Sequence, residues 1–370
     1  MKISMISTLP PIKGLSPYTL GLVKELSKSY EIDFYGFKKI YPEFLYPSVT
    51  KTKEKQPKIN NVKVINNLTW YNPFSWIKTG FQIKTEIVHA QWWSWFLAPV
   101  FYIILKIAKM RDKKIIMTIH NVKPHEKSLI KNWLNNSVIN LADEYIVHNE
   151  KNKKIFLKVL NTPRKVNVIP HGIIEMKESK KSIYKLKKEY GFENTDKILL
   201  FFGNIRDYKG LDNLFESLYL LKDNSVKLII AGKPWGSFQV YENLIKNLKL
   251  DNRIKLFLEF NSEAQIAELF KISDLAIFPY KEFEAASGAA AVAINYKKPM
   301  VVTSVGGLTD LVNDKKVIAK ANNPKNLKEG IIYALNNLNR LAKDSEKKIK
   351  EFSWSNIAKK TINVYQNEKS

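Results

Sequence analysis

Residues 199–210 read Leu199-Leu200-Phe201-Phe202-Gly203-Asn204-Ile205-Arg206-Asp207-Tyr208-Lys209-Gly210. An apolar run ends at Gly203, and Arg206 and Lys209 follow before a helical pattern over Leu211–Leu221. This order predicts a strand, a tight turn and a helix N-terminus with two cations beside it. Backbone N–H groups, the positive end of the helix dipole and the two basic side chains can converge there on one anion.

A second block lies downstream, where residues 278–288 read Phe-Pro-Tyr-Lys-Glu-Phe-Glu-Ala-Ala-Ser-Gly. An apolar strand here runs into carboxylates and then into a helix start made of small residues. Another strand, Met300–Thr303, precedes the turn at Gly306-Gly307. The two blocks together are typical of a site for a nucleotide-linked sugar.

The length of the chain, 370 residues, exceeds one ordinary core and fits two domains. Hydrophobic residues make up 45% of it, which is enough to bury both cores. Short apolar runs alternate with helical patterns in both halves, which predicts an α/β fold with parallel sheets. We place the domain joint near Gly172–Ser179. Two open sheets of this kind would leave a cleft at the carboxyl ends of their strands.

Several classes of protein are disfavoured by the composition. The chain has no cysteine, which excludes disulfides and thiolate metal sites and favours a reducing cytoplasm. It opens on a strand-like run, Lys2–Ile6, rather than on a secretory signal. The longest apolar stretch, Trp92–Ile107, is interrupted by polar residues and by Pro99. It falls short of the roughly 20 residues that a membrane-spanning helix needs, so we predict a buried helix.

The net charge of +25 predicts attraction to polyanions, such as an anionic membrane surface or phosphorylated substrates. A lysine-rich compositional bias or the charged surface of a thermophile would produce the same surplus. No zinc finger, RNP-type strand or basic zipper is recognisable, so nucleic acid is not expected as a partner.

The chain resembles the GT-B retaining glycosyltransferases of family 4 over nearly its whole length. Three segments carry most of the resemblance: residues 202–210, residues 284–307 and the closing Phe352-Ser353-Trp354. Weaker support comes from the Gly14 loop, from residues 118–121 and from residues 168–172. The order and spacing of these motifs are more specific than any one of them.

The resemblance implies two Rossmann-like domains that face a central cleft. Residues 1–175 would bind the acceptor, and residues 176–352 would bind the nucleotide-sugar. The last helix, within 353–370, would cross back to the first domain. It also implies transfer with retention of configuration from a UDP- or GDP-linked sugar to a glycan or lipid-phosphate-linked acceptor, with no metal and no separate cofactor. The absence of an Asp-x-Asp triplet agrees with the lack of a metal.

Arg206 and Lys209 are the first candidate site residues. Negative charge develops on a nucleoside diphosphate as its bond to the sugar breaks, and fixed cations can stabilise that charge where a metal would otherwise act. The alternative is a solvated pair at a helix start. Cations oppose the dipole at a helix N-terminus, so a bound anion explains this pair better.

Glu284 matches the first glutamate of the paired-glutamate motif in this family, which would orient the donor sugar through its hydroxyls. Glu282 is a competing assignment, and a surface carboxylate is the structural alternative. The second glutamate of the motif, which usually holds the ribose, is replaced here by Val292. Ribose recognition is therefore expected from elsewhere.

Three small residues complete the predicted donor site. Ser287 and Gly288 would let backbone amides approach the phosphates, and the Gly14 loop would lie against the phosphates and the acceptor. A plain turn would also explain Gly14, and backbone freedom alone would explain Gly288.

Among the histidines, His120 ends a predicted strand and matches the histidine near the reaction centre of the family. It could hydrogen-bond the donor sugar or the β-phosphate. A strand-end histidine bonded to the backbone is the alternative. His89, His148 and His171 are predicted to be structural, and no pair of histidines has the spacing of a metal site.

The region 68–81 is rich in aromatic residues and belongs to the predicted acceptor domain, with lysines at 51, 53, 55 and 58 nearby. Such a combination suits a bilayer surface, which predicts a cytoplasmic protein that can attach to the cytoplasmic membrane face. These aromatics could equally cover a core. Two other functions remain open at this point: a sugar-nucleotide 2-epimerase, and a non-catalytic nucleotide-binding protein, which Val292 would favour.

Overall fold

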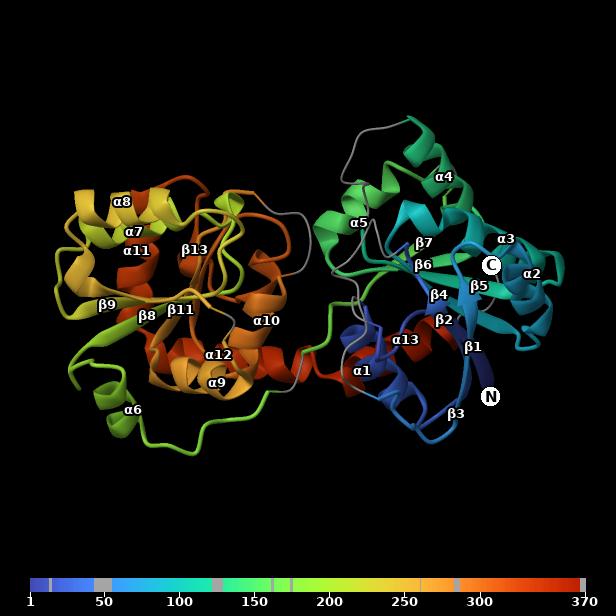
Figure 1. Ribbon diagram of the computed structural model, residues 1–370, viewed down its shortest axis with the longest axis horizontal. Helices are drawn as coiled ribbons and strands as arrows, with labels where there is room; N and C mark the ends of the chain where they lie inside the picture. Colours follow the sequence, from blue (N-terminus) through green and yellow to red (C-terminus); the bar gives the residue numbers. More distant parts are fainter. Residues whose placement is uncertain are drawn as a thin grey trace. The chain divides into compact units, whose positions relative to one another are not determined.

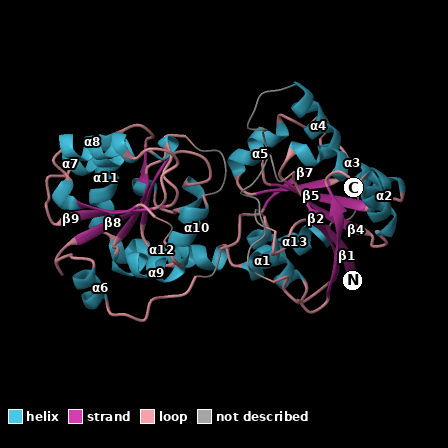
Figure 2. Cartoon of the chain, viewed as in Figure 1, coloured by secondary structure: helices cyan, strands magenta, loops and turns pink. Residues whose placement is uncertain are grey.

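The computed structural model describes residues 1–12, 15–42, 55–121, 129–160, 163–173, 176–259, 261–282 and 287–366 (Figure 1). The chain forms two compact units, Met1–Gly172 with Phe352–Ser370, and Ile173–Glu351. Each unit has one parallel sheet with helices beside it (Figure 2). The predicted α/β class, with two parallel-sheet domains, is confirmed.

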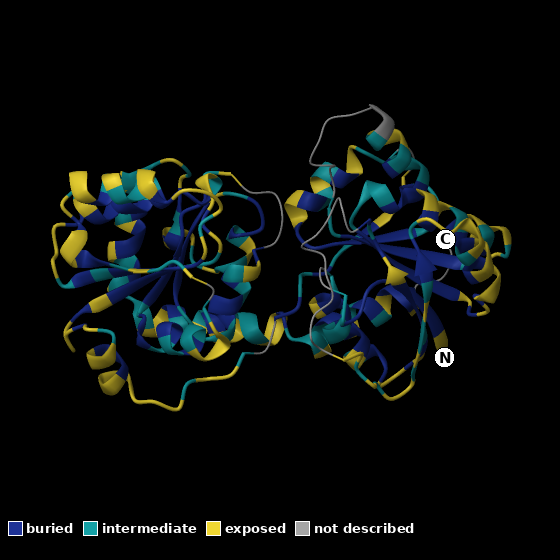
Figure 3. Ribbon diagram, in the orientation of Figure 1, coloured by how far each residue is buried: buried dark blue, intermediate teal, exposed yellow. Residues whose placement is uncertain are grey.

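The first unit is built on a seven-stranded sheet in the order β3-β2-β1-β4-β5-β6-β7. The strands are β1 Lys2–Ile6, β2 Glu31–Lys39, β3 Val62–Thr69, β4 Ile87–Trp92, β5 Lys114–Ile119, β6 Glu144–Val147 and β7 Lys165–Val168. Its helices are α1 Ser16–Leu26, α2 Pro73–Gln82, α3 Ala98–Met110, α4 Leu129–Ile139, α5 Glu150–Leu157 and α13 Trp354–Gln366, with a 3-10 turn η1 at Trp95–Leu97. Strands β4, β5 and β6 are buried along their whole length, as expected for a parallel sheet covered on both faces (Figure 3).

The alternation of side chains along β5 separates the two cores of this unit. Ile115 and Met117 belong to the cluster built around α3, whereas Ile116 belongs to the cluster that includes α1 and α13. Successive side chains of a strand point to opposite faces, so one apolar run supplies both layers. The last helix therefore completes one face of the first sheet.

Helix α13 docks through two aromatic side chains. A Cβ on Gly21 would lie 2.2 Å from the Trp354 ring, and one on Gly172 would lie 2.5 Å from it, so only glycine lets the indole approach. The Tyr365 hydroxyl lies 2.6 Å from Nδ1 of His89 in β4. The C-terminal helix thus packs on the first unit, as the resemblance implies, through Trp354 and Tyr365.

The second unit has a six-stranded parallel sheet in the order β10-β9-β8-β11-β12-β13. The strands are β8 Lys197–Phe202, β9 Val226–Ala231, β10 Ile254–Phe257, β11 Leu275–Phe278, β12 Met300–Thr303 and β13 Ile318–Ala319. The helices are α6 Ile183–Glu189, α7 Leu211–Leu220, α8 Gln239–Asn247, α9 Glu263–Ile272, α10 Gly288–Asn295, α11 Pro324–Leu335 and α12 Leu338–Glu351. Short 3-10 turns are η2 Asp207–Lys209, η3 Asp251–Arg253, η4 Thr309–Leu311 and η5 Lys315–Val317.

One sequence expectation about the first unit is wrong in detail. The stretch Trp92–Ile107 is not one helix, because Trp92 ends strand β4 and α3 begins only at Ala98, after the 3-10 turn. Pro99 lies in the first turn of α3, where its missing N–H costs no hydrogen bond. In the part of the chain that the structure describes, no helix combines the length and apolarity needed to cross a membrane.

Candidate functional site

The loop after β8 is joined to the loop after β9. The backbone N–H of Ile205 donates to the carbonyl oxygen of Lys233 (2.9 Å), and that of Trp235 donates back to Ile205 (2.9 Å). The chain then makes the 3-10 turn η2, passes Gly210 and enters α7. Because parallel strands end at the same edge of a sheet, this pairing places both loops at the carboxyl edge of the second sheet.

Lys209 is buried in this loop, with 8% of its surface exposed. Its Nζ lies 5.0 Å from the centroid of the Tyr280 ring, and a Cβ on Gly203 would lie 3.0 Å from it. No carboxylate of the described residues lies within ion-pair distance of this ammonium group. Burial, followed by the positive charge of Arg206, lowers the pKa of Lys209 to about 8. A buried cation without a counter-charge is suited to an anionic ligand.

Arg206 is exposed and lies over an aromatic ring. Its guanidinium carbon lies 4.1 Å from the centroid of Trp235, in the loop after β9. Such stacking engages the face of the guanidinium plane and holds its orientation, while the N–H groups at its edge can donate. Arg206 and Lys209, predicted together from the sequence, therefore lie close enough for each charge to influence the other.

Ser287 and Gly288 begin helix α10. The Ser287 hydroxyl accepts from the Ala290 N–H (3.3 Å) and lies 3.0 Å from the hydroxyl of Tyr280. A Cβ on Gly288 would meet no atom of the described residues within 4 Å. Since Tyr280 contacts both Lys209 and Ser287, one buried ring joins the two blocks predicted from the sequence.

The remaining donor-site predictions fall in two groups. Gly14 and Glu284 lie outside the described residues. Glu282, the alternative to Glu284, is exposed. Val292 lies in α10 with 9% of its surface exposed, so this position offers an apolar side chain where the family motif has its second glutamate.

Substitution of Gly210 by Ala is expected to destabilise the second unit. Gly210 has φ +69°, and a Cβ there would lie 2.1 Å from the carbonyl oxygen of Pro279. Gly236 provides the control, because it has φ +108° but no atom of the described residues lies within 4 Å of its Cβ position. Urea unfolding should show a loss of about 1–2 kcal/mol for Gly236→Ala, from backbone strain alone, and a larger loss for Gly210→Ala. Equal losses in the two variants would show that the close approach of the Pro279 carbonyl oxygen adds nothing to the cost of a Cβ at position 210.

His120, the predicted site residue of the first unit, follows β5. Its Nε2 lies 2.7 Å from Oε1 of Gln91, and its Nδ1 lies 3.1 Å from Nε2 of His148. The buried Tyr18 ring packs nearly perpendicular to the imidazole, with a centroid distance of 4.8 Å. Burial, followed by the neighbouring histidines, lowers the pKa of His120 well below its ordinary value. The imidazole is therefore neutral at pH 7, with a partner at each nitrogen.

Four residues of these sites were not named as site residues from the sequence: Trp235, Tyr280, Gln91 and His148. Trp235 lies between two glycines after a buried strand, which is a signal similar to that of the Gly203 loop. His148 was predicted to be structural, and it is buried, but it also bonds His120 directly. In the described part of the chain, no group of three or more His, Asp or Glu side chains is arranged to hold a metal ion.

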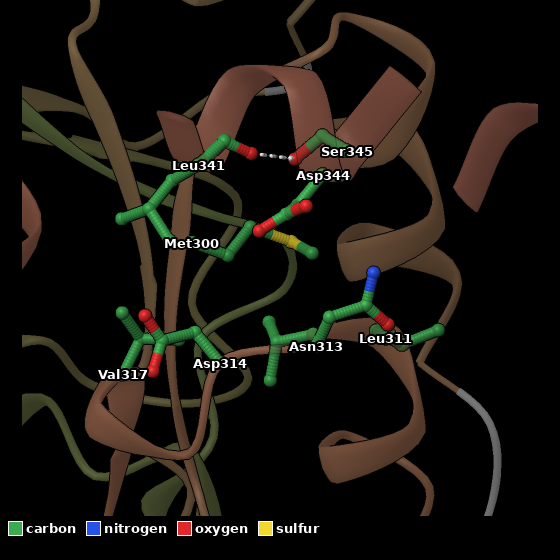
Figure 4. Close-up of a pocket in the computed structure, with 9 residues that line it drawn as sticks. Met300, Leu311, Asn313, Asp314, Val317, Leu341, Asp344 and Ser345 are labelled. Carbon is green, nitrogen blue, oxygen red and sulfur yellow. Dashed lines mark hydrogen bonds between the residues drawn. The ribbon is translucent and has the colours of Figure 1, made fainter. Parts of the chain in front are cut away.

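A small cavity in the second unit lies between α12 and the segment after β12 (Figure 4). Its lining includes Met300, Asp314, Leu341, Asp344 and Ser345, and its volume of about 10 Å³ is close to the space of one water molecule. Asp314 already pairs with Arg340. This cavity is too small for a nucleotide or a sugar.

Known proteins match both units. Residues 182–352 match the family described as glycosyl transferases group 1, and residues 12–175 match glycosyltransferase family 4. An uncharacterised glycosyltransferase of Methanocaldococcus jannaschii is 29% identical over 230 residues, which are 58% of this chain and 57% of that protein. The N-acetyl-alpha-D-glucosaminyl L-malate synthase of Bacillus anthracis is 25% identical over 207 residues, 54% of this chain and 52% of that protein. The chain thus spans about half the length of the curated relatives it matches.

Solved structures match the whole chain. HepE of Anabaena in complex with UDP has a TM-score of 0.72 at 17% identity, with 99% of each chain covered. Sucrose-phosphate synthase of Thermosynechococcus elongatus has a TM-score of 0.69 at 16% identity, with 99% of this chain and 98% of that chain covered. At such identities the likeness shows the fold alone.

Proposed function

The chain belongs to the group 1 glycosyl transferases of GT-B fold, and on this basis we propose that it moves a sugar from a nucleoside diphosphate-sugar to an acceptor. The observation that carries the proposal is the pair of cations at the carboxyl edge of the second sheet. Lys209 is buried beside Arg206 and has no carboxylate partner among the described residues. A diphosphate would supply the missing counter-charge.

In the proposed reaction, Arg206 and Lys209 hold the diphosphate and stabilise the charge that develops as the glycosidic bond breaks. They take the place that a divalent ion has in metal-dependent transferases, and no cofactor besides the donor is required. Glu284 would orient the sugar, and His120 and the Gly14 loop would line the acceptor side. We further propose that the transfer retains the anomeric configuration and that the acceptor is a glycan or a lipid-linked sugar.

The first experiment is a thermal-shift screen against UDP, GDP, ADP, CMP and dTDP and their sugar conjugates. UDP heads the series because HepE, which has the same fold, was solved with UDP. Products are then assayed with and without acceptor, which separates a transferase from an epimerase and from a non-catalytic binder. Stabilisation by one diphosphate and product only with acceptor would support the proposal. No stabilisation by any of them would contradict it.

Binding of the diphosphate is expected to be linked to protonation of Lys209. With a pKa of about 8 in the unliganded protein, about nine tenths of this side chain is charged at pH 7 and about one tenth at pH 9. A bound diphosphate raises that pKa, so binding at pH 9 should take up a proton and be about tenfold weaker than at pH 7. Calorimetry in buffers of different ionisation enthalpy measures both effects. Lys209→Arg, which stays charged, should bind equally well at the two pH values.

We also propose that the first unit contacts an anionic membrane surface through helix α2. Phe74, Ile77 and Phe81 lie on one side of this helix and are exposed by 82%, 41% and 61%, while Trp76 and Gly80 are buried. Helix α3 packs alongside, and a Cβ on Gly80 would lie 2.9 Å from Ile107. The segment 71–113 contains six basic residues, at 78, 84, 106, 109, 111 and 113, and two acidic ones, at 86 and 112. An apolar stripe among lysines is typical of an interfacial helix.

Loss of two aromatic side chains tests this surface. Phe74→Ser with Phe81→Ser should weaken binding to vesicles that contain anionic lipid by at least about tenfold, because each ring buried in the interface contributes about 1.5–3 kcal/mol. Tyr219→Ser, at a position 54% exposed in the second unit, is the control and should bind as the unmodified protein does. Co-sedimentation with neutral and with anionic vesicles measures both. Unchanged binding of the double variant would remove α2 from the contact.

A further inference from the structure

A continuous chain of hydrogen bonds runs through the first unit behind His120. Its first anchor is the carbonyl oxygen of Ile169, 3.0 Å from Nδ1 of His148. Nε2 of His148 contacts Nδ1 of His120 (3.1 Å), and Nε2 of His120 contacts the Gln91 amide (2.7 Å). The segments that follow β7, β6, β5 and the end of β4 thus contribute one link each, from neighbouring strands of one sheet.

Beyond Gln91 the series of hydrogen bonds continues into the fully buried interior. Nε2 of His89 lies 3.2 Å from Nε2 of Gln91 and 2.8 Å from the hydroxyl of Thr118. Its Nδ1 lies 2.6 Å from the hydroxyl of Tyr365 in α13. His89, Gln91 and Thr118 have no exposed surface, so water does not complete these contacts.

The number of protons on the two imidazoles limits which of these hydrogen bonds can form at the same time. A carbonyl oxygen only accepts, so Ile169 requires a proton on Nδ1 of His148, and Oε1 of Gln91 requires one on Nε2 of His120. The bond between the two rings needs a third proton, whereas two neutral imidazoles carry two. With the Gln91 amide in this orientation, all three bonds form only when the pair holds one extra proton.

A neutral arrangement exists if the Gln91 amide turns over. Its NH₂ group then donates to Nε2 of His120, and Nδ1 of His120 donates to Nε2 of His148. The Gln91 oxygen accepts from Nε2–H of His89, whose Nδ1 accepts from Tyr365. Every group has a partner and no ring is charged. The charge of the histidine pair is thereby linked to the orientation of one amide.

The surroundings favour the neutral arrangement. Among the described residues, the titratable groups around the pair include Tyr18 of α1, His89 of β4, His171 after β7 and Tyr365 of α13. Burial lowers the pKa of His148 to about 3, with the charge of His171 as the next cause. A second positive charge in this cluster would be close to the first. At pH 7 both rings are therefore neutral.

We propose that His148 and Gln91 are positioning residues, which hold His120 with its proton on Nδ1 and its lone pair on Nε2. A hydroxyl of a bound substrate would then donate to Nε2 in place of the Gln91 amide. The assignment of the tautomer follows from the hydrogen-bond geometry together with the neutrality of both rings. Its use in sugar transfer rests on the proposed function.

The tautomers are measured by NMR on protein labelled with ¹⁵N in histidine, with His120→Gln and His148→Gln used to assign the signals. At pH 7.5 we expect a proton on Nδ1 and none on Nε2 in both His120 and His148. In His148→Gln the amide oxygen can replace the lost acceptor, so His120 should keep its proton on Nδ1. A proton on Nε2 of His120 in the neutral protein would overturn the assignment.

Kinetics test the second half of the proposal. His148→Phe fills the space without a hydrogen bond and should lower kcat by about tenfold or more with little change in KM. His148→Gln should recover most of that loss, because its amide oxygen can accept from Nδ1–H of His120 as the His148 ring does. Unchanged kcat in a folded His148→Phe variant would overturn the positioning role. If the unmodified protein transfers no sugar, the proposed function fails, and the NMR result still decides the tautomer.

Discussion

Substitution of Arg206 by Ala is expected to lower kcat/KM for sugar transfer by about 10²–10³-fold, which corresponds to about 2.7–4 kcal/mol of transition-state stabilisation. The reason is that the charge on the departing diphosphate grows during the reaction, and a fixed guanidinium stabilises that charge without reorganising. Arg206 is exposed and stacks on Trp235, so its removal opens no core cavity. The free energy of unfolding should stay within about 0.5 kcal/mol of the original value.

Two further variants serve as controls for Arg206→Ala. Arg206→Lys keeps the charge but loses the planar donor edge, and it should retain part of the activity. Lys233→Ala removes an exposed cation from the neighbouring loop. It should leave kcat/KM nearly unchanged, which would show that the loss in Arg206→Ala does not come from a general reduction of positive charge. Full activity in folded Arg206→Ala would remove this residue from the mechanism. Removal of Arg206 should also raise the pKa of Lys209, because the two charges repel.

The first unit is expected to lose stability steeply in mild acid. Burial lowers the pKa of His89 and of His148 from 6.5 to about 3. The unfolded chain takes up protons below pH 6.5 while these folded rings stay neutral, so stability is complete above pH 6.5 and falls as the pH drops toward 3. At pH 5 each ring costs about 2 kcal/mol, and the two together cost about 4 kcal/mol. His120 and His171, whose pKa values are also lowered, add to this loss.

The measurement is urea unfolding at pH 7.5 and at pH 5, followed by tryptophan fluorescence. All five histidines of the chain, at 89, 120, 125, 148 and 171, belong to the first unit, and Trp235 is the one tryptophan within 173–351. The fluorescence therefore reports mainly on the unit that should respond. In His148→Gln the difference between the two pH values should shrink by about 2 kcal/mol. A difference that does not change would mean that His148 is not held neutral by the fold.

Much of the fold could be predicted from the sequence, because strands and helices leave their period in contiguous residues. The apolar runs of β8 and β11 and the helical pattern of α7 are examples. Helix α2 was not predicted from the sequence, and it contains Pro73 and Gly80, two residue types that weaken a helix interior. Asn72 caps this helix through the Phe74 N–H, Pro73 lies in the first turn, and Gly80 allows α3 to approach. The need for glycine at position 80 follows from the close packing of α3, which the local sequence does not reveal.

In the candidate site, too, some residues could be predicted from the sequence and others could not. Arg206, Lys209 and Ser287 could be named from the sequence because each follows a strand and precedes a helix in one local motif, and their roles stay predictions. Helix α12 and the partners of these residues were not predicted. The ring of Trp235, which lies under Arg206, follows β9, and that of Tyr280, which contacts Lys209, follows β11, whereas Arg206 and Lys209 follow β8.

By itself, the sequence determined the α/β class, the two parallel sheets and the motifs that mark a group 1 glycosyl transferase, because these depend on order and spacing along the chain. Only the tertiary structure decided that Lys209 is buried without a carboxylate partner among the described residues, and that His148 and Gln91 bond the two nitrogens of His120. The physical reason is that burial and proton sharing depend on which strands are neighbours in a sheet, and the order of parallel strands is set by packing between distant segments.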